Sequence, residues 1–178
     1  LTKKQFHAKI ILEKFKTFSK EFSNEITLLR ALKYPSIINF VGYTQNNDEN
    51  NGYPVLFTEF YQNGSLFNVL EIEHKKELHK NHLDTWNNTK KMICLIGIAI
   101  GMQYIHEHNI IHLNLKSTNI LLDENLYPKI SGFSKSKNVE HYDYYQTNTF
   151  QKDMSIIAPE LISNNESYSF PVDIFAYS

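Results

Sequence analysis

Apolar residues near the start of the chain shift from the spacing of a strand to that of a helix. Residues 5–12 place β-branched and aromatic side chains on both sides of Lys9, as a strand does. After Ser19, which suits a helix N-cap, apolar residues recur every three or four positions until Pro35. Because Glu25 and Leu29 are four residues apart, they share one side of this predicted helix. The apolar face is formed by Phe22, Ile26, Leu29 and Lys33.

Two more strand-like runs, residues 36–44 and 54–61, enclose a segment rich in the turn formers Asn, Asp and Gly. We therefore expect a hairpin with a solvated loop. Residues 63–70 begin with a turn and predict a short helix, and residues 71–82 predict a charged surface stretch.

One long apolar segment dominates the second half of the chain. Residues 84–106 predict a helix that is apolar all round and therefore buried on most sides. Short strands are expected on both sides of a polar loop at residues 112–119, with a hairpin turn at 123–125. The polar, tyrosine-rich residues 134–155 predict a mobile loop, and residues 171–178 predict the opening of another apolar helix.

Composition places the chain among folded globular proteins. It has 178 residues, of which 42% are hydrophobic and 21% charged, so it is long enough for one domain or a good part of a larger one. The net charge of -1 and the pI near 6.8 give no support to nucleic-acid binding or to binding at an anionic membrane surface.

The lone cysteine, Cys94, lies in an apolar run and is read as a small buried hydrophobe in a reducing, cytoplasmic setting. The run from Met92 to Met102 is about half of the ~20 apolar residues that a membrane span needs, which favours a buried helix. Since the chain has neither a start methionine nor a signal segment, we expect it to begin within a longer protein.

The loop at residues 112–119 concentrates polar side chains, His112, Asn114, Lys116 and Asn119, between two apolar stretches. The order of elements around it resembles the eukaryotic protein kinase domain, and in particular its tyrosine-kinase-like branch. That order is a strand with Lys9, a helix with Glu25, a hairpin, a long helix, this loop, "KISGFS", "IAPE" and "PVDIFAYS". Each motif alone is weak, but their shared order and spacing are specific.

The resemblance implies an α+β fold with two lobes. Residues 1–60 would form part of a small β-rich lobe, and residues 61–178 would form part of a mainly helical large lobe. The match would begin at the third strand of the small lobe and end inside the central helix of the large lobe. The glycine-rich phosphate loop and the last helices would then lie outside this sequence.

The resemblance also implies a nucleotide site. Lys9 would reach the α- and β-phosphates and pair with Glu25. The alternative interpretation is a lysine on the surface and a solvated glutamate that do not form a site. Thr58 would be the gatekeeper, and the backbone of Glu59 and Tyr61 would face the adenine; Asn119 and Leu121 complete the predicted nucleotide contacts.

His7 makes nucleotide binding doubtful, because kinases have a small alanine at this position, beneath the adenine ring. The alternative interpretation is that the strand is locally shifted and that His7 merely packs.

Two carboxylates that phosphoryl transfer needs are replaced. Asn114 stands where the family has the aspartate that orients the substrate hydroxyl, and a carboxamide has no basic site at neutral pH. Gly132 replaces the metal-binding aspartate, and a shift of one position would place Ser131 there instead. Asn119 and Lys116 persist, but Asn119 alone is a poor ligand for Mg²⁺, so we expect weak or absent metal binding.

Leu113 replaces the arginine that would hold a phosphorylated activation loop, and Ser134 replaces the glycine after Phe133. Architectural positions, by contrast, are retained: the resemblance places an apolar column between the lobes, with Asp173 anchoring it. The column consists of Leu29, Phe40, His112 and Phe133.

These patterns predict a catalytically impaired pseudokinase, an allosteric or scaffolding module whose partners are other signalling proteins. The alternative is an active Ser/Thr or Tyr protein kinase that transfers the γ-phosphate of ATP, and a third interpretation is a truncated product without function. A first minor hypothesis is a zinc site at His106, His108 and His112, although no cysteine pair or catalytic carboxylate accompanies these residues in the sequence. A second is phosphorylation of the activation segment by another kinase. The candidate phosphorylation sites are Tyr142, Tyr144, Tyr145, Thr147 and Thr149.

Overall fold

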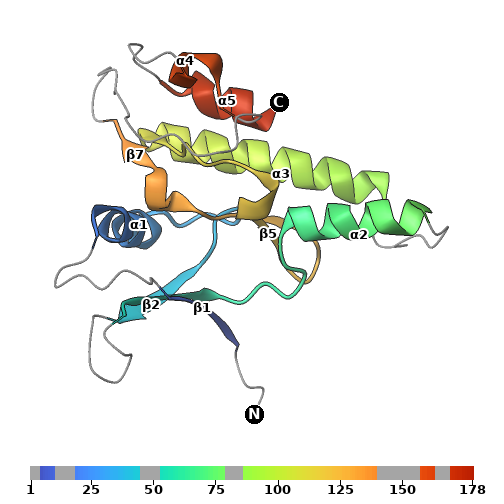
Figure 1. Ribbon diagram of the computed structural model, residues 1–178, viewed down its shortest axis with the longest axis horizontal. Coiled ribbons are helices and arrows are strands. Elements are labelled where there is room, and N and C mark those ends of the chain that lie inside the picture. Colours follow the sequence, from blue (N-terminus) through green and yellow to red (C-terminus); the bar gives the residue numbers. More distant parts are fainter. Residues whose placement is uncertain (1–4, 11–18, 45–52, 79–85, 140–156, 163–168) are drawn as a thin grey trace.

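The computed structural model describes residues 5–10, 19–44, 53–78, 86–139, 157–162 and 169–178. The small antiparallel sheet lies at the bottom of Figure 1, the helices α1 and α2 lie on opposite sides above it, and α3 lies above both. The sheet is formed by β1 (Phe6–Ile10), β2 (Phe40–Thr44) and β3 (Val55–Glu59), and the larger helices are α1 (Lys20–Ala31), α2 (Leu66–Leu78) and α3 (Asn88–Glu107). This is the α+β arrangement that the sequence predicts.

The sheet has the order β1-β3-β2, with both pairs antiparallel. The predicted hairpin of β2 and β3 is therefore present, although its loop, residues 45–52, lies outside the described residues. The run predicted as one strand at residues 36–44 is divided. Its first part leaves the sheet and contacts the helical part instead, because Ile130 N donates to Ser36 O at 2.7 Å and Ile38 N donates to Ile130 O at 3.1 Å.

Helix α1 begins where the sequence predicts. The Oγ of Ser19 accepts a hydrogen bond from Phe22 N, which satisfies one of the free amides of the first turn. The helix ends at Ala31, before Pro35, so Lys33 lies outside it and is exposed rather than on its apolar face. Glu25 and Leu29 are both buried on the same side, as predicted.

Helix α2 is longer than predicted. The charged stretch after residue 70 continues the helix to Leu78, because its charges stabilise it. Lys75 pairs with Glu71 one turn away at 2.8 Å, and Glu73 pairs with Lys91 of α3 at 2.5 Å.

Helix α3 starts at Asn88 rather than at residue 84, since the side chain of Asn87 accepts from Lys90 N and caps it. The expectation that it is buried on most sides is wrong. Cys94, Ile98 and Met102 are buried, but Met92 is 57% exposed and Ile96 is 50% exposed. When apolar residues occur on every face of a helix, the sequence does not show which of those faces other elements cover.

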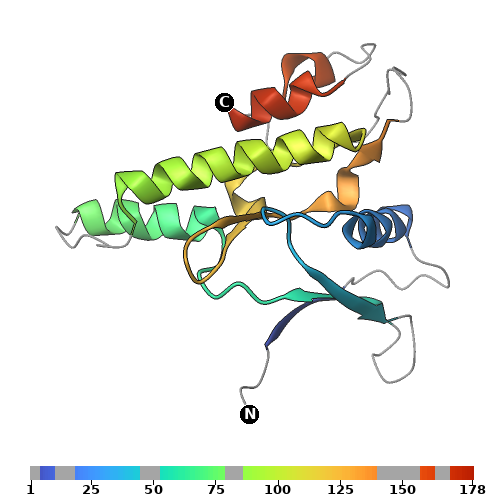
Figure 2. The ribbon, with the colours of Figure 1, turned by 180° about the vertical axis from the view of Figure 1, so that it is seen from behind.

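The remaining elements are short and bring the polar loop to the middle of the molecule (Figure 2). The strands β4 and β7 pair on one side of it, and β5 and β6 pair on the other. The start of the predicted mobile loop is regular, because η3 covers residues 133–135 and β7 covers residues 137–138, whereas residues 140–156 lie outside the described residues. The bounds are β4 (Ile110–Ile111), η2 (Ser117–Asn119), β5 (Ile120–Leu122), β6 (Pro128–Ile130), η3 (Phe133–Lys135), β7 (Lys137–Asn138), α4 (Pro159–Ile162) and α5 (Pro171–Tyr177).

Candidate functional site

The pair of Lys9 and Glu25 joins the sheet to α1. The Nζ of Lys9 lies 2.7 Å from Oε2 of Glu25, whose side chain is only 4% exposed. A buried carboxylate is stable when a cation and hydrogen bonds compensate for lost water, and Lys9 supplies both. The alternative of a surface lysine and a solvated glutamate is therefore wrong.

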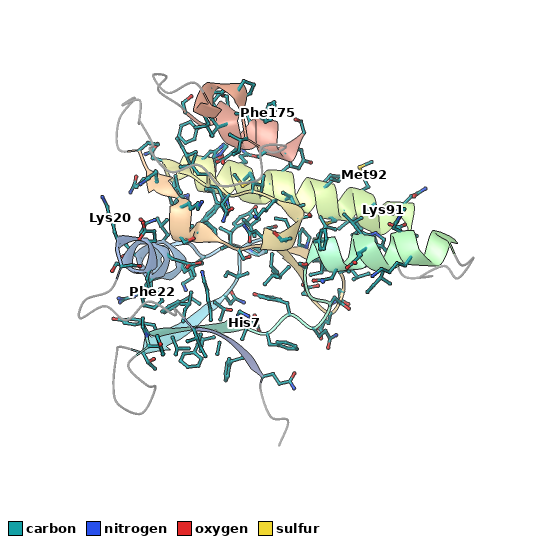
Figure 3. All side chains as sticks on the ribbon, viewed as in Figure 1. His7, Lys20, Phe22, Lys91, Met92 and Phe175 are labelled. Atoms are coloured by element: carbon teal, nitrogen blue, oxygen red, sulfur yellow. The ribbon has the colours of Figure 1, made fainter. Side chains whose placement is uncertain are left out.

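His7 lies two residues before Lys9, so the alternation of a strand places both on the same face of β1. It is paired in register with Thr58 and its side chain is exposed (Figure 3). The strand is not shifted, since Lys9 reaches Glu25, and His7 is not packed. The alternative interpretation of His7 is therefore wrong, and an imidazole stands on the face where the resemblance implies a small residue.

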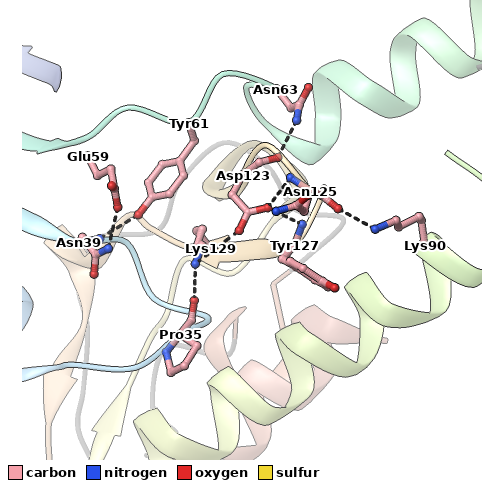
Figure 4. Close-up of polar contacts among 10 residues, drawn as sticks. All are labelled: Pro35, Asn39, Glu59, Tyr61, Asn63, Lys90, Asp123, Asn125, Tyr127 and Lys129. Atoms are coloured by element: carbon pink, nitrogen blue, oxygen red, sulfur yellow. Dashed lines mark hydrogen bonds and ion pairs between the residues drawn. The ribbon is translucent and has the colours of Figure 1, made fainter. Parts of the chain in front are cut away.

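The segment from Thr58 to Tyr61 connects the sheet to the helical part. Thr58 is buried at 4% exposure, as a gatekeeper position would be. Glu59 N donates to Asn39 O at 3.0 Å, and the Glu59 carboxylate accepts from Asn39 Nδ2 (Figure 4). The Glu59 amide is thus bonded within the protein.

Tyr61 points inward, and its Oη accepts a hydrogen bond from Asn39 N at 3.0 Å (Figure 4). Burial raises the pKa of Tyr61 to about 12, so the phenol stays protonated at neutral pH. Half-buried Leu121 pairs with Ser65 in a single antiparallel β-bridge outside the sheets. Tyr61 and Leu121 therefore help to fix the geometry of the connection between the two parts.

The polar loop begins at His112, which is completely buried. Its Nδ1 accepts from Asn114 N at 3.2 Å, so Nε2 carries the proton and donates to Ser131 O at 3.0 Å. Burial lowers the pKa of His112, in agreement with a neutral ring. The rings of His112 and Phe133 pack edge to face, with 4.9 Å between their centroids. This contact joins the loop at residues 112–119 to the segment that contains Gly132 and Phe133.

The side chains of Asn114 and Asn119 hold the loops together rather than projecting freely. Asn114 Nδ2 donates to Gly132 O at 3.3 Å, and Asn119 Nδ2 donates to Asn114 O at 2.8 Å. Ser131 donates from N and from Oγ to Asn119 O, each at 2.8 Å. Phe133 is buried against His112, which agrees with the alignment that places Gly132, rather than Ser131, at the predicted metal position.

Gly132 adopts a left-handed conformation, with φ of 86°, immediately before η3. A Cβ at this position would lie 2.7 Å from Asn119 Nδ2. The space that a side chain at residue 132 would enter is therefore occupied by the amide of Asn119.

Asp173, at the start of α5, anchors the loop from the other side. Its carboxylate accepts from His112 N at 2.7 Å and from Leu113 N at 2.8 Å, and it lies 2.9 Å from His106 Nε2. Leu113 has a positive φ of 59°, a conformation that costs energy in a residue with a Cβ. The bond to Asp173 holds it there.

The residues of the predicted column are buried or half-buried. Leu29, His112 and Phe133 are fully buried, and half-buried Phe40 packs against the same core. Sequence reasoning missed Ser136, whose Oγ donates to His112 O and whose carbonyl accepts from Asn24 Nδ2. Ser136 links the loop to α1, and the only sequence signal was its position after the glycine-phenylalanine motif.

Mg²⁺ does not fit the residues that the structure describes at this site. A hard dication needs carboxylates, and in the described ranges neither Asn114, Asn119 nor Gly132 has a carboxylate partner. Glu25 is engaged by Lys9, and Asp173 by the loop backbone. The residues that remain at this site are amides and lysines.

The zinc hypothesis fails on geometry. His106 bonds to Asp173, His108 bonds to Tyr104 O, and His112 bonds to Ser131 O. These three rings point to three different partners, and no group of metal-ligating residues exists in the part of the chain that the structure describes. No described helix has the length and apolar character to cross a bilayer. The predicted phosphorylation sites at residues 142–149 lie outside the described residues.

A sheet lysine paired with a helical glutamate, above a loop anchored by a buried aspartate, defines a protein of the kinase-fold class. The family model for protein tyrosine and serine/threonine kinases matches residues 2–178. The chain belongs to this family.

Curated proteins with similar sequences are also kinases by name. One is a serine/threonine-protein kinase of Dictyostelium discoideum, named as probable, which is 33% identical over 89% of this chain and 14% of that protein. Another is the cysteine-rich receptor-like protein kinase 28 of Arabidopsis thaliana, 34% identical over 88% of this chain and 22% of that protein. A third is a leucine-rich repeat receptor-like protein kinase of Arabidopsis thaliana, 32% identical over 89% of this chain and 15% of that protein, whose name describes it as "probably inactive". The chain thus spans a small part of each of these relatives.

Proposed function

We propose that this chain is a pseudokinase domain, a signalling module that works through binding rather than through phosphoryl transfer. The observation that carries the proposal is the absence of a carboxylate at both positions that handle the proton and the metal. Asn114 and Gly132 occupy these positions, and both are bonded into the loops. A lost general base alone typically lowers a rate by ~10² to 10⁴.

The retained architecture supports a module that keeps its shape for partners. Lys9 pairs with Glu25, and His112, Phe133 and Asp173 hold the loops in a defined conformation. A fold that retains these contacts without its reactive groups suits an allosteric or scaffolding role. Its partners would be other signalling proteins, such as an active kinase or a protein substrate.

The residue roles belong to the same proposal. Lys9, Glu25, Thr58, Glu59, Tyr61, Asn119 and Leu121 would line the nucleotide cleft, and Lys116 would stand beside the degenerate base position Asn114. We place the boundary between the lobes at residue 60, and the module in the cytoplasm, where a single unpaired cysteine is ordinary.

The second candidate function is an active protein kinase that transfers the γ-phosphate of ATP to a protein hydroxyl. The ion pair of Lys9 and Glu25 favours it, since this pair positions phosphates in the family. The names of the relatives favour it too, because most of them are serine/threonine kinases.

Radiolabelled phosphate transfer by the full chain, with Mg²⁺ or Mn²⁺ and a general protein substrate, separates the two functions. We expect incorporation no greater than that of the matched variant Lys9→Met. Turnover at ordinary kinase rates of about 1–100 s⁻¹ that Lys9→Met abolishes would refute the pseudokinase proposal.

The double variant Asn114→Asp with Gly132→Asp sharpens the assay. If the scaffold is intact and only the two carboxylates are missing, the double variant gains activity that Lys9→Met removes again. Each single substitution should remain inactive, since proton handling and metal binding are both required.

A further inference from the structure

The polar groups of Ser136 bond to three different parts of the molecule. Its N donates to Phe133 O at 3.1 Å and closes η3, and its Oγ donates to His112 O of the polar loop at 3.0 Å. Its carbonyl accepts from Asn24 Nδ2 of α1 at 2.7 Å. Because Ser136 is only 1% exposed, these bonds are shielded from water. Ser136 is therefore a junction between η3, the polar loop and α1.

The helix α1 is held from two directions by neighbouring residues. Asn24 reaches the Ser136 carbonyl, and the next residue, Glu25, pairs with Lys9 of β1 at 2.7 Å. Successive side chains of an α-helix point about 100° apart, so the two contacts pull on different sides of α1. Apolar burial is non-directional, whereas a hydrogen bond requires a short distance and a favourable angle. The two polar contacts therefore define the rotation of α1 about its own axis.

The contact with Ser136 also joins α1 to the anchor of the polar loop. The backbone of His112 donates from N to the Asp173 carboxylate at 2.7 Å and accepts from Ser136 Oγ. The short helix η3, which ends at Ser136, packs directly against α1 (Figure 1). A continuous polar path thus runs from α5 through the polar loop to α1, and it ends one residue before Glu25.

We propose that Asn24, Ser136 and His112 form a latch that sets the rotation of α1 and thereby keeps Glu25 at Lys9. The ion pair is then held by the protein itself and needs no ligand in the cleft. This inference rests on the proposed function, because it explains how a module without reactive groups keeps one shape for its partners. Asn24 and Ser136 are positioning residues, since they act on Lys9 through Glu25.

A double-mutant cycle on the full chain measures the coupling between the latch and the ion pair. Urea unfolding compares the parent chain with Asn24→Ala, Lys9→Met and the double variant. We expect Asn24→Ala to lower the folding equilibrium constant about tenfold in the parent chain, but by less than about threefold in Lys9→Met. The second effect is smaller because the ion pair that Asn24 positions is already absent.

Thr27→Ala is the matched control. Thr27 is exposed on α1, and its Oγ1 donates to Ser23 O within the same helix at 2.9 Å. The substitution should therefore have the same effect with and without Lys9. Asn24→Asp keeps the shape of the side chain but has no donor for the Ser136 carbonyl, so it should behave like Asn24→Ala.

The position of α1 can be measured in the folded chain with nitroxide labels at Lys20→Cys and Met92→Cys. Both sites are exposed, on α1 and α3 (Figure 3), whereas the native Cys94 is 2% exposed and does not compete for the label. Pulsed electron paramagnetic resonance should give a narrow distance distribution for the parent chain and for Thr27→Ala. Asn24→Ala and Ser136→Ala should each broaden it or shift its maximum by about 2 Å or more.

The proposal is overturned if Asn24→Ala and Lys9→Met are additive, if Asn24→Asp behaves like the parent chain, or if both latch variants keep the parent distance distribution. Should Asn24→Ala fail to fold, Ser136→Ala decides, since it keeps the carbonyl that accepts from Asn24 and loses only the bond to His112. Phosphate transfer at kinase rates would refute the pseudokinase proposal, whereas additive variants would refute the latch alone.

Discussion

The two sides of the polar loop differ in the acidic side chains that they contain. On one side Asp173 is 2% exposed, and its carboxylate accepts from His112 N and Leu113 N and contacts His106. On the other side Asn114 has no charge, and its side chain donates one long bond of 3.3 Å to Gly132 O. The carboxylate that holds the backbone is present, whereas Asn114 and Gly132, which we propose occupy the positions of the proton-handling and metal-binding groups, carry none. The loop at residues 112–119 is thus held by an acidic residue of α5, whereas it contains no acidic residue itself.

The largest effect should come from removing the anchor. Asp173→Ala leaves two buried amides without acceptors and releases the strained backbone of Leu113, so the free energy of unfolding should fall by about 3–5 kcal/mol. Urea unfolding followed by circular dichroism measures this. Asp173→Asn keeps an acceptor oxygen and should lose less; equal losses in the two variants would show that the hydrogen bonds are not what Asp173 contributes.

A smaller effect is expected from a side chain at Gly132, the residue at the proposed metal position. Gly132→Ala must adopt a positive φ and displaces Asn119, whose Nδ2 lies 2.7 Å from the new Cβ, so it should cost about 1–2 kcal/mol. Gly42→Ala is the control, since nothing lies within 4 Å of its Cβ. If both variants unfold at the same urea concentration, the site is more plastic than its contacts indicate.

The pH dependence of stability tests the residue between the two sides. Burial lowers the pKa of His112, so below about pH 6.5 the unfolded chain binds a proton that the folded chain refuses. The free energy of unfolding should therefore decrease as the pH falls from 6.5, by up to ~1.4 kcal/mol per pH unit from this group.

Urea unfolding at pH 7.5, 6.5 and 5.5 gives the slope. His112→Asn should reduce it, while His108→Gln, at an exposed position, should not. A slope that is unchanged in His112→Asn would mean that His112 is accessible to protons in the folded chain.

The sequence predicted the parts of this comparison that depend on the order of motifs. The pairing of Lys9 with Glu25 and the anchoring by Asp173 were predictable because each residue has a fixed place in the family's pattern. Asn24 and Ser136 were not, since their importance arises from contacts between segments distant in sequence. The exposed side of α3 and the hydrogen bond between Ser36 and Ile130 were not predicted. The pattern of apolar residues does not say which other segment packs against an element.

The smallest effect should come from the degenerate base position itself. Asn114→Ala removes a single long hydrogen bond to a half-exposed carbonyl and leaves the backbone contacts of the loop in place, so the free energy of unfolding should change by less than about 1 kcal/mol. Asn114 and Asp173 flank the same histidine, so measuring both alanine variants under identical conditions compares the two sides directly. If Asn114→Ala proved as destabilising as Asp173→Ala, the amide would be a structural replacement for the lost aspartate, and its presence would no longer count as a mark of lost catalysis alone.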